Sequence, residues 1–439
     1  MSEFDVVVVG AGLAGATVAR ECATRGMRTV VLEGRDRVGG RAWTTKLSSG
    51  EPIDIGGTYF SWNQPHIWSE ITRYGLVNEV VPSNHEPAEW ALAPRGDGLE
   101  WCTIEEHVQR EMPLLERFFE QSYEVFPRPY DPLHARDEVA KLDHMTVRDR
   151  LDQLDFPPDD AAMVGTLLTT LAGDTNDKTS FVTMLHWWAS AGHNYVEYYS
   201  DLQNSKLERG IASLVELMLA DGGAELRLSS PVAEIASDRE GVRVSLASGE
   251  TVTGLVVVVA TPTGVWPYLD FSPALSADRL AAAREGMQVH RGSKSVAVIR
   301  GESRIFACTP LTGHPITAIW TTHQLSDNEQ VVALLSSPAM NNPEDPAEVG
   351  AAIADLLPGT ELLELHSSNF GPDDEFTRGA WCMLKPGQLT RIAPHETLTK
   401  PEGRVVFATS DIASNWNSFL DGAIESGLHA AREVRNILG

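Results

Sequence analysis

The stretch that decides the fold is Val6-Val-Val-Val-Gly10-Ala-Gly12-Leu-Ala-Gly15, close to the start of the sequence. Four successive valines are typical of a parallel strand that is buried on both faces. The glycines follow with the spacing GxGxxG and open a helical pattern that ends near Gly26. A second apolar strand covers positions 29–32 and ends at Glu33. A strand, glycine turn, helix and second strand with a terminal acid form the dinucleotide-binding fingerprint.

Each part of this fingerprint has a role in holding a dinucleotide. Gly10, Gly12 and Gly15 allow a tight turn and a close approach of the backbone to a pyrophosphate. The first helical turn, which includes Ala14, offers free N–H groups and the positive end of the helix dipole to that anion. Glu33 would accept hydrogen bonds from the ribose hydroxyls. The fingerprint alone does not separate NAD from FAD.

The composition is that of an ordinary globular protein with a strong acidic excess. The 439 residues include 35 basic and 61 acidic side chains, which give a formal net charge of −26. This charge would repel phosphate and therefore argues against nucleic acid and anionic membrane surfaces as partners. A cationic substrate would be attracted, although we expect most of the charge to be solvated surface.

The cysteines and histidines are not spaced as metal ligands or as a disulfide framework. The sequence has no CxxC pair, and no two of its 13 histidines lie three to five residues apart. A reducing compartment fits four widely separated cysteines. The first strand begins too early for a signal peptide, and no apolar run reaches the ~18–20 residues of a membrane span. We therefore expect a cytoplasmic protein without a metal site. The sequence does not determine the oligomeric state, and a homodimer is one of the states that it allows.

The secondary structure that the sequence pattern predicts changes twice after the fingerprint. Residues 76–204 read as mostly helical, with capping boxes at Thr103-x-x-Glu106 and Thr146-x-x-Asp149. From residue 224 the alternation is that of strands, and residues 294–335 contain several more. The last helical pattern covers the C-terminal residues from about 420 onward. This order predicts an α/β protein.

Five further segments resemble motifs of one enzyme family and keep their order along the chain. They are residues 32–42 with Gly39-Gly40-Arg41, residues 53–59 with Gly56-Gly57-Thr58, Ser230-Pro231-Val232, residues 257–262, and residues 408–423. Together with the fingerprint they resemble the FAD-dependent flavin monoamine oxidases, most of all the bacterial branch that includes 6-hydroxynicotine oxidase and related amine oxidases.

The resemblance implies a Rossmann-like FAD-binding domain that is discontinuous in sequence and a mixed α+β substrate domain, as in monoamine oxidases. The FAD-binding domain would take residues 1–75, 205–285 and 376–439. The substrate domain would take the helical part 76–204 and the sheet part 286–375.

The resemblance also implies the cofactor and the reaction. FAD would be bound by Gly10, Gly12, Ala14, Gly15, Glu33, Arg35, Gly40, Arg41, Gly56, Gly57, Thr58, Val232, Asp411, Phe419 and Leu420. A hydride would pass from the carbon beside the nitrogen of a small amine to flavin N5 and leave an imine, and O2 would reoxidise the flavin to give H2O2. The start of the last helix would favour negative charge on the reduced flavin.

Four residues are expected at the reacting centre. In the family two aromatic rings frame the substrate amine, and the matching positions are Trp381 and Phe419. Many relatives have two tyrosines there, so this chain departs from the pattern and a preference for primary amines is in doubt. Tyr59 is expected to line the pocket. Lys294 matches a lysine that holds a water against flavin N5, and it lies at the head of a strand that reads as buried on both faces.

Two further expectations concern the flavin linkage and the pocket entrance. In covalently flavinylated relatives a cysteine precedes the cage aromatic, and here that position is Ala380, which predicts a non-covalent flavin. Cys382 lies on the other side of Trp381, where strand alternation would turn it the same way as Ala380. Five aromatic residues would either line the entrance of the pocket or fill a helical core, and the core is the favoured position for most of them. They are Trp187, Trp188, Tyr195, Tyr198 and Tyr199.

Two alternatives to an amine oxidase of this kind stay open. An amino-acid oxidase on the same fold would need an arginine facing the substrate carboxylate, and a polyamine oxidase would need several acids in the pocket. A non-catalytic binding protein of this fold is the remote alternative, and loss of the flavin-facing motifs would mark it.

Overall fold

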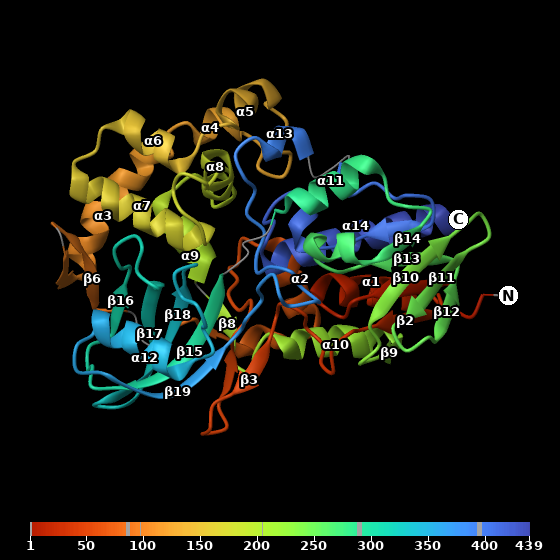
Figure 1. Cartoon of the computed structure of the whole chain (residues 1–439), viewed down its shortest axis with the longest axis horizontal. Coiled ribbons are helices and arrows are strands. Elements are labelled where there is room, and N and C mark those ends of the chain that lie inside the picture. The colour runs from red at the N-terminus through yellow and green to blue at the C-terminus, as the bar shows by residue number, and fades with distance from the viewer. Residues whose placement is uncertain (1, 85–87, 97, 204, 288–291, 393–396) are drawn as a thin grey trace.

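The half of the molecule that contains the glycine-rich stretch is built on a five-stranded parallel sheet. The computed structural model describes residues 2–84, 88–96, 98–203, 205–287, 292–392 and 397–439. The strands lie in the order β20 (Val405–Phe407), β13 (Val256–Val259), β1 (Val6–Val9), β2 (Thr29–Leu32) and β9 (Glu225–Arg227). Val6 lies opposite Val256 on one side and Thr29 on the other. The sheet therefore joins segments from both ends and the middle of the chain (Figure 1).

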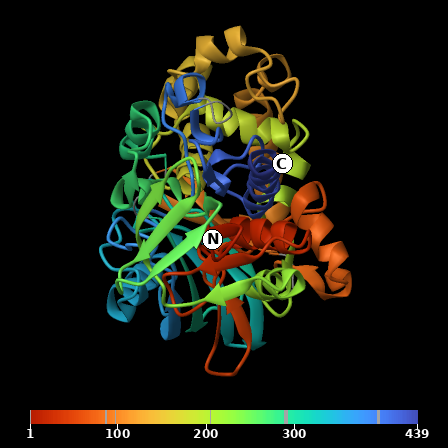
Figure 2. The ribbon, with the colours of Figure 1, turned by 90° about the vertical axis from the view of Figure 1, so that its right-hand side faces the viewer.

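Each face of this sheet is covered by a separate layer, as a doubly buried parallel sheet requires. On one face pack the helices α1 (Leu13–Ala23), α10 (Ala212–Gly222) and α14 (Leu420–Leu438). On the other packs a four-stranded sheet in the order β12 (Thr251–Gly254), β11 (Val242–Leu246), β10 (Val232–Ser237) and β14 (Asp270–Ser272). Figure 2 shows α14 lying beside α1.

The second half is a seven-stranded sheet with helices on either side. Its order is β19 (Glu361–Ser367), β15 (Ser293–Arg300), β18 (Glu329–Ser336), β17 (Ile316–Ser326), β16 (Phe306–Cys308), β6 (Trp90–Arg95) and β7 (Gly98–Thr103). Helix α12 (Pro346–Leu356) covers one face. In Figure 1 the helices listed next lie above the sheet: α3 (Ile104–Phe118), α4 (Ser122–Val125), α5 (Arg136–Leu142), α6 (Val147–Leu154), α7 (Pro158–Ala172), α8 (Phe181–Ser190) and α9 (Tyr195–Gln203).

Short elements connect the two halves. They are the strand pairs β3 (Thr44–Lys46) with β4 (Pro52–Asp54) and β5 (Val80–Pro82) with β8 (Ser205–Leu207), and the helices α2 (Pro65–Arg73), α11 (Ala277–Glu285) and α13 (Gln388–Ile392). Short 3-10 turns cover Leu76–Glu79, Thr263–Tyr268 and Ser410–Ile412. Within the described ranges, no helix has the length and apolar character needed to cross a membrane.

The α/β class is confirmed, and so are both capping boxes, which open α3 and α6. The expectation of a mostly helical stretch at 76–204 missed β6 and β7. These two strands form a hairpin with each other, and β6 also pairs with β16, which comes much later in the chain, so their place in the seven-stranded sheet is not visible in the local sequence. Strand β15 is buried on both faces as predicted, with Val296 and Ala297 in different apolar clusters.

Candidate active site

A cavity of about 520 Å³ lies between the two halves and gathers most of the predicted site residues. Its wall includes Tyr59, Lys294, Trp381 and Phe419, the four residues expected at the reacting centre. Thirteen of the fifteen residues expected to bind the cofactor also line it, all except Gly15 and Asp411. Sequence segments at positions 9–14, 56–59, 231–232, 376–381 and 418–423 thus meet around one space.

The glycine turn opens the first helix of the fold directly into this cavity. Gly10 has φ of +105°, and a Cβ there would lie 2.9 Å from the Ala260 carbonyl oxygen. Gly12, the N-cap of α1, has no side chain to cap the helix, and the first turn contains no acid. The free N–H groups of this turn therefore face a space that can accept an anion.

Two backbone amides hold the Glu33 carboxylate at the end of β2. Oε2 accepts a hydrogen bond from the Ala11 N–H at 2.7 Å, and Oε1 accepts one from the Arg35 N–H at 2.9 Å. The side chain is buried and lines the cavity. A carboxylate has four lone-pair sites, so both oxygens can still accept bonds from a sugar hydroxyl.

Gly15 does not line the cavity, so its expected contact with the cofactor stays a prediction. A Cβ at Gly15 would lie only 2.0 Å from the Gly10 carbonyl oxygen. Gly15 therefore keeps α1 close to the strand and the turn.

Arg41 is held in place by a ring of acceptors from the C-terminal part of the chain. Its guanidinium donates to the Ala380 carbonyl at 3.0 Å, to Asp411 Oδ1 at 2.8 Å and to Ser410 Oγ at 3.0 Å. Asp411 is fully buried and does not line the cavity, so its expected contact with the cofactor stays a prediction. Its other oxygen accepts the Thr263 N–H at 2.9 Å, so Asp411 holds Arg41 and Thr263 together.

A salt bridge that the sequence motifs did not reveal lies at the Glu33 end of the cavity. The Arg35 guanidinium bonds both carboxylate oxygens of Asp374, at 2.7 and 2.6 Å. It also lies 5.1 Å from the centre of the Phe376 ring. Arg35 belongs to the first part of the chain and its partners to the last, so no local signal could have found this pairing.

The start of α14 meets the second glycine motif at the opposite end. The Gly57 N–H donates to the Arg41 carbonyl at 2.9 Å, and a Cβ on Gly57 would touch Leu420 at 3.2 Å. Phe419 is the N-cap of α14 and supplies no capping oxygen. The first turn of α14 thus presents uncapped N–H groups beside Gly57, as expected for a helix end that favours negative charge.

Asp421 ties this helix end to α2. Oδ1 accepts the backbone N–H groups of His66 at 2.6 Å and of Ile67 at 2.9 Å, and Oδ2 lies 2.8 Å from His66 Nδ1. Burial acts to lower the pKa of His66, but the hydrogen bond and charge of Asp421 outweigh it and raise that pKa above 6.5.

Aromatic rings form the wall on the side of the seven-stranded sheet and the helices. Trp381 donates its indole N–H to the Leu171 carbonyl at 3.1 Å. The Phe419 ring packs edge-on against Trp187, with 5.1 Å between ring centres. Tyr59 lies beside Trp320, with 6.4 Å between ring centres. These contacts fix three of the rings by which a small apolar ligand would be framed.

The aromatic stretch after residue 186 divides as expected between core and cavity. Trp187 lines the cavity, whereas Trp188, Tyr195 and Tyr198 are buried in the helical core, against which Tyr199 packs. Wall residues that the sequence did not suggest are Thr170, Leu171, Trp320 and Leu335. They come from α7, β17 and β18, whose apolar residues have no pattern that separates a cavity wall from a core.

Lys294 is buried at the head of β15 and points at the second glycine motif. Its ammonium donates to Thr58 Oγ1 and lies 3.5 Å from the Gly56 carbonyl oxygen and 4.5 Å from the centre of the Tyr59 ring. Burial lowers the pKa of Lys294 to about 7, although the negative charge of Asp54 acts in the opposite direction. The residue can therefore carry or release a proton near neutral pH.

The two positions beside Trp381 differ in access to the cavity. Ala380 lines it. Cys382 is fully buried, and its Sγ faces the Asp411 carbonyl at 3.7 Å. Burial raises the pKa of the Cys382 thiol and so disfavours the reactive thiolate.

The residues around the cavity fit a flavin dinucleotide. Two helix N-termini without capping side chains, the Arg41 guanidinium and the oriented Glu33 carboxylate provide sites for pyrophosphate, an electron-rich ring and ribose. Gly56 cannot carry a side chain, because its Cβ would lie 2.1 Å from the Arg41 carbonyl oxygen. Gly56 therefore keeps this backbone close to Arg41 at the wall of the cavity.

Comparison with known proteins agrees with this assignment. The family model of flavin-containing amine oxidoreductases matches residues 13–435. The chain is 33% identical to nicotine dehydrogenase of Pseudomonas putida, over 99% of this chain and 89% of that protein. It is 26% identical to (S)-6-hydroxynicotine oxidase of Paenarthrobacter nicotinovorans, over 98% and 99% of the two chains. A structure of putrescine oxidase bound to putrescine shares the fold, with a TM-score of 0.80 at 20% identity over 99% of both chains. The chain therefore belongs to the flavin-containing amine oxidoreductases, which are FAD enzymes.

Proposed function

We propose that this member of the flavin-containing amine oxidoreductase family oxidises a small secondary or tertiary monoamine, with O2 as the electron acceptor. When bound, FAD would take the hydride from the carbon beside the nitrogen, so that the amine becomes an imine, and pass two electrons to O2 to give H2O2. The observation that carries the proposal is the apolar, aromatic wall of Trp381, Phe419, Trp187, Leu171 and Leu335 next to Lys294.

The residues of this wall would act by position and by exclusion of water. Trp381, held by the Leu171 carbonyl, and Phe419, held by Trp187, would frame the neutral amine. The uncapped start of α14 would stabilise negative charge on the bound cofactor. Lys294 Nζ would hold a water on the cavity side and give or take a proton there.

The charged groups in the described wall favour a monoamine over an amino acid or a polyamine. Each of the three arginines is engaged: Arg35 with Asp374, Arg41 with Asp411, and Arg378 with the Pro372 carbonyl and the Tyr268 ring. The two acids of the wall are Glu33, which two backbone amides hold, and Glu375, which is exposed. A carboxylate on the substrate would therefore meet arginines that already have partners, and neither acid is a buried carboxylate without a partner that a second ammonium group could use.

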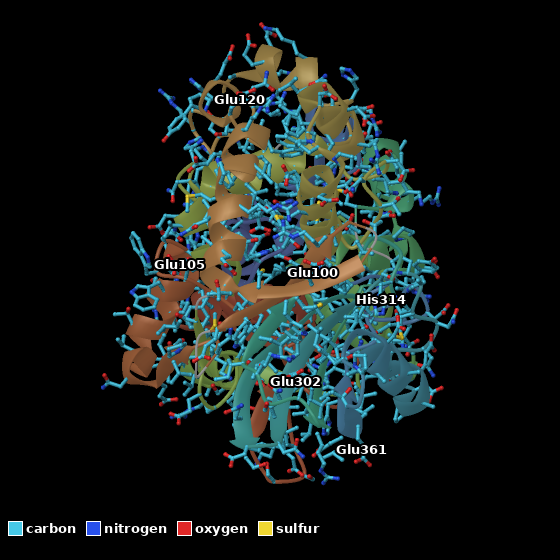
Figure 3. The ribbon with its side chains drawn as sticks, turned by 90° about the vertical axis from the view of Figure 1, so that its left-hand side faces the viewer. Glu100, Glu105, Glu120, Glu302, His314 and Glu361 are labelled. Carbon is cyan, nitrogen blue, oxygen red and sulfur yellow. The ribbon has the colours of Figure 1, made fainter. Side chains whose placement is uncertain are left out.

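The surface and the cysteines support two further parts of the proposal. Figure 3 shows Glu100, Glu105, Glu120, Glu302 and Glu361 spread over one side of the molecule, from the helices to the sheet, rather than gathered in one patch. The acidic excess is accordingly assigned to solvated surface. All four cysteines are free, which favours a reducing compartment, and we place the protein in the cytoplasm.

An amine panel tests this function. The purified, FAD-loaded protein is incubated in air with nicotine-pathway compounds, simple aliphatic amines, putrescine and an amino acid, and H2O2 is measured. We expect peroxide with a secondary or tertiary monoamine and little with putrescine or the amino acid. Turnover that requires an artificial acceptor instead of O2 would overturn the choice of acceptor, and turnover confined to putrescine would overturn the substrate class.

A further inference from the structure

A second, much smaller cavity lies behind Lys294. It has a volume of about 30 Å³. Thr58, Tyr59 and Lys294 line both this cavity and the cofactor cavity, so these three side chains separate the two spaces. A polar cavity needs only about 10–15 Å³ of this kind of volume to hold a water molecule. The small cavity therefore has room for water in contact with the lysine.

The wall of the small cavity is unusually rich in ionisable groups for a space this size. Strand β4 and the residue before it supply Asp54 and Glu51, β8 and the residue after it supply Lys206 and Glu208, and β17 supplies His323. Hydroxyl groups of Ser83, Thr58 and Thr322 complete the polar lining. Elements that are distant in sequence thus bring polar groups to one face of Lys294.

The outer wall of the cavity connects to the surface through one pair. His323 Nε2 lies 3.2 Å from Glu51 Oε2, and His323 Nδ1 lies 3.1 Å from Thr322 Oγ1. The Glu51 side chain is 32% exposed and the His323 side chain 14%, whereas Lys294 is 9% exposed. Protons can therefore enter or leave this pair from solvent, although Lys294 itself has little access.

Of the three other charged groups, Glu208 is exposed, whereas Asp54 and Lys206 are more buried. Both oxygens of Asp54 are within 3.3 Å of the Ile211 N–H, and Oδ1 also accepts the Thr44 hydroxyl at 2.5 Å. Burial lowers the pKa of Lys206, whereas the charges of Glu51 and Asp54 act to raise it. The negative charge of Asp54 raises the pKa of Lys294, and the positive charge of Lys206 lowers it. Burial has the largest effect on how readily Lys294 releases its proton, and these two charges adjust it in opposite directions.

We propose that this polar cavity is the route by which Lys294 exchanges protons with solvent while the cofactor cavity is filled. The Lys294 ammonium gives one proton to water in the small cavity, and that water passes a proton to the Glu51 and His323 pair. The same number of protons leaves from the pair to solvent, and the reverse sequence recharges the lysine. No electron moves in this exchange. Lys206 and Asp54 are positioning residues that tune it.

The inference rests on the proposed function only in that FAD lies beside Lys294. A route on this side is needed because a ligand in the cofactor cavity cuts the water that Lys294 holds there off from bulk solvent. The test therefore uses FAD-loaded protein without any amine. If no amine substrate is found, the proposed function fails but this test of the proton route can still succeed, and the reverse also holds.

The experiment is a pH jump across pH 7, followed by the absorbance of the bound flavin in a stopped-flow instrument. A change of charge at Lys294 alters the electrostatic field at the flavin and hence its spectrum. We expect Lys294→Met to remove the spectral response. We expect His323→Asn and Glu51→Gln to keep the response but slow it at least about tenfold, because one proton carrier is missing.

His314→Asn is the matched control. His314 is also largely buried, at 12% side-chain exposure, and also pairs with an acid, Asp355, but it lies outside the small cavity. Its variant should relax at the wild-type rate. Wild-type rates in both His323→Asn and Glu51→Gln overturn the proposal, and so does a response that survives Lys294→Met.

Two further variants keep the proposal falsifiable if His323→Asn does not fold. Thr322→Val removes the hydroxyl next to His323 with little change of shape, and it should also slow the relaxation. Lys206→Gln should raise the pKa of Lys294, read by NMR on flavin-free protein with ¹³C-labelled lysine. The chain has only seven lysines, and Lys294→Met assigns the signal. An unchanged midpoint would remove Lys206 from the scheme.

Discussion

Removal of the Asp421 carboxylate should loosen the helix end that lines the cofactor cavity. Asp421 is fully buried and belongs to the first turn of α14, next to Leu420 and Ala423, which line the cofactor cavity. It caps α2 by accepting the N–H groups of His66 and Ile67. The substitution Asp421→Ala leaves both N–H groups and the His66 ring without this partner.

The magnitude follows from the bonds that are lost. A buried donor left without an acceptor costs roughly 1–3 kcal/mol, so two such donors and a charged bond predict a loss of about 3–5 kcal/mol. The entropy of unfolding is about 2.1 cal/mol/K per residue, so a chain of this length loses about 1 °C of Tm per kcal/mol. We therefore expect Asp421→Ala to melt about 3–5 °C below the wild type and to bind FAD more weakly.

The effect should depend on pH in a defined direction. The pKa of His66 is raised in the folded state, so its contribution is fully present below pH 6.5 and is lost as the pH rises through the folded pKa. The difference in Tm between wild type and Asp421→Ala should therefore be larger at pH 5.5 than at pH 8.5. Asp421→Asn keeps an oxygen for the two N–H groups and should lose mainly the pH-dependent part.

Thermal unfolding of flavin-free protein at both pH values is the assay. The control is Asp355→Ala, which removes the acid from a second histidine pair, with 3.5 Å to His314, but whose own side chain is 79% exposed. An exposed pair is worth little, so its Tm should stay within about 1 °C of the wild type. Equal melting of Asp421→Ala and wild type would refute the reasoning, as would a pH-independent difference between them.

The site supports four other predictions. Glu33→Gln should raise the Kd for FAD by about 10–100-fold, because the amide replaces one of two acceptor oxygens with a donor; fluorescence titration measures this, and unchanged affinity contradicts the assigned role. Acid precipitation should release all flavin into the supernatant, since Cys382 faces away from the cavity, and flavin in the pellet would contradict a non-covalent cofactor. Lys294→Met should keep the fold and FAD binding but slow flavin reoxidation, which stopped-flow measurement of both half-reactions would detect; wild-type rates would remove Lys294 from the mechanism. Raising the salt concentration should change kcat/KM for a cationic amine only slightly, because the acids are dispersed, and a steep fall would reveal electrostatic steering.

The sequence by itself determined the cofactor-binding strand, turn and helix. The stretch from Val6 to Gly15, with Glu33 after the next strand, specifies a local structure in which backbone amides do the binding. Such a unit depends on spacing and on glycine conformations, which are local properties. The resemblance to the family predicted further site residues, and all of the following line the cavity: Gly39, Gly40, Arg41, Lys294, Trp381 and Phe419. The boundaries of the two domains stay a prediction.

Only the tertiary structure decided which residues act together. Arg41 forms a salt bridge with Asp411, and Arg35 forms one with Asp374. The partners are separated by most of the length of the chain, and nothing in the sequence around either acid indicates which arginine it binds. The apolar wall at Leu171, Trp320 and Leu335 could not be told from core, because both consist of buried apolar side chains. The polar cavity behind Lys294 exists only because elements from distant parts of the sequence pack around it. Burial and long-range pairing determine the pKa values in the site and which side chains there already have partners. Burial and long-range pairing both arise from packing rather than from sequence spacing.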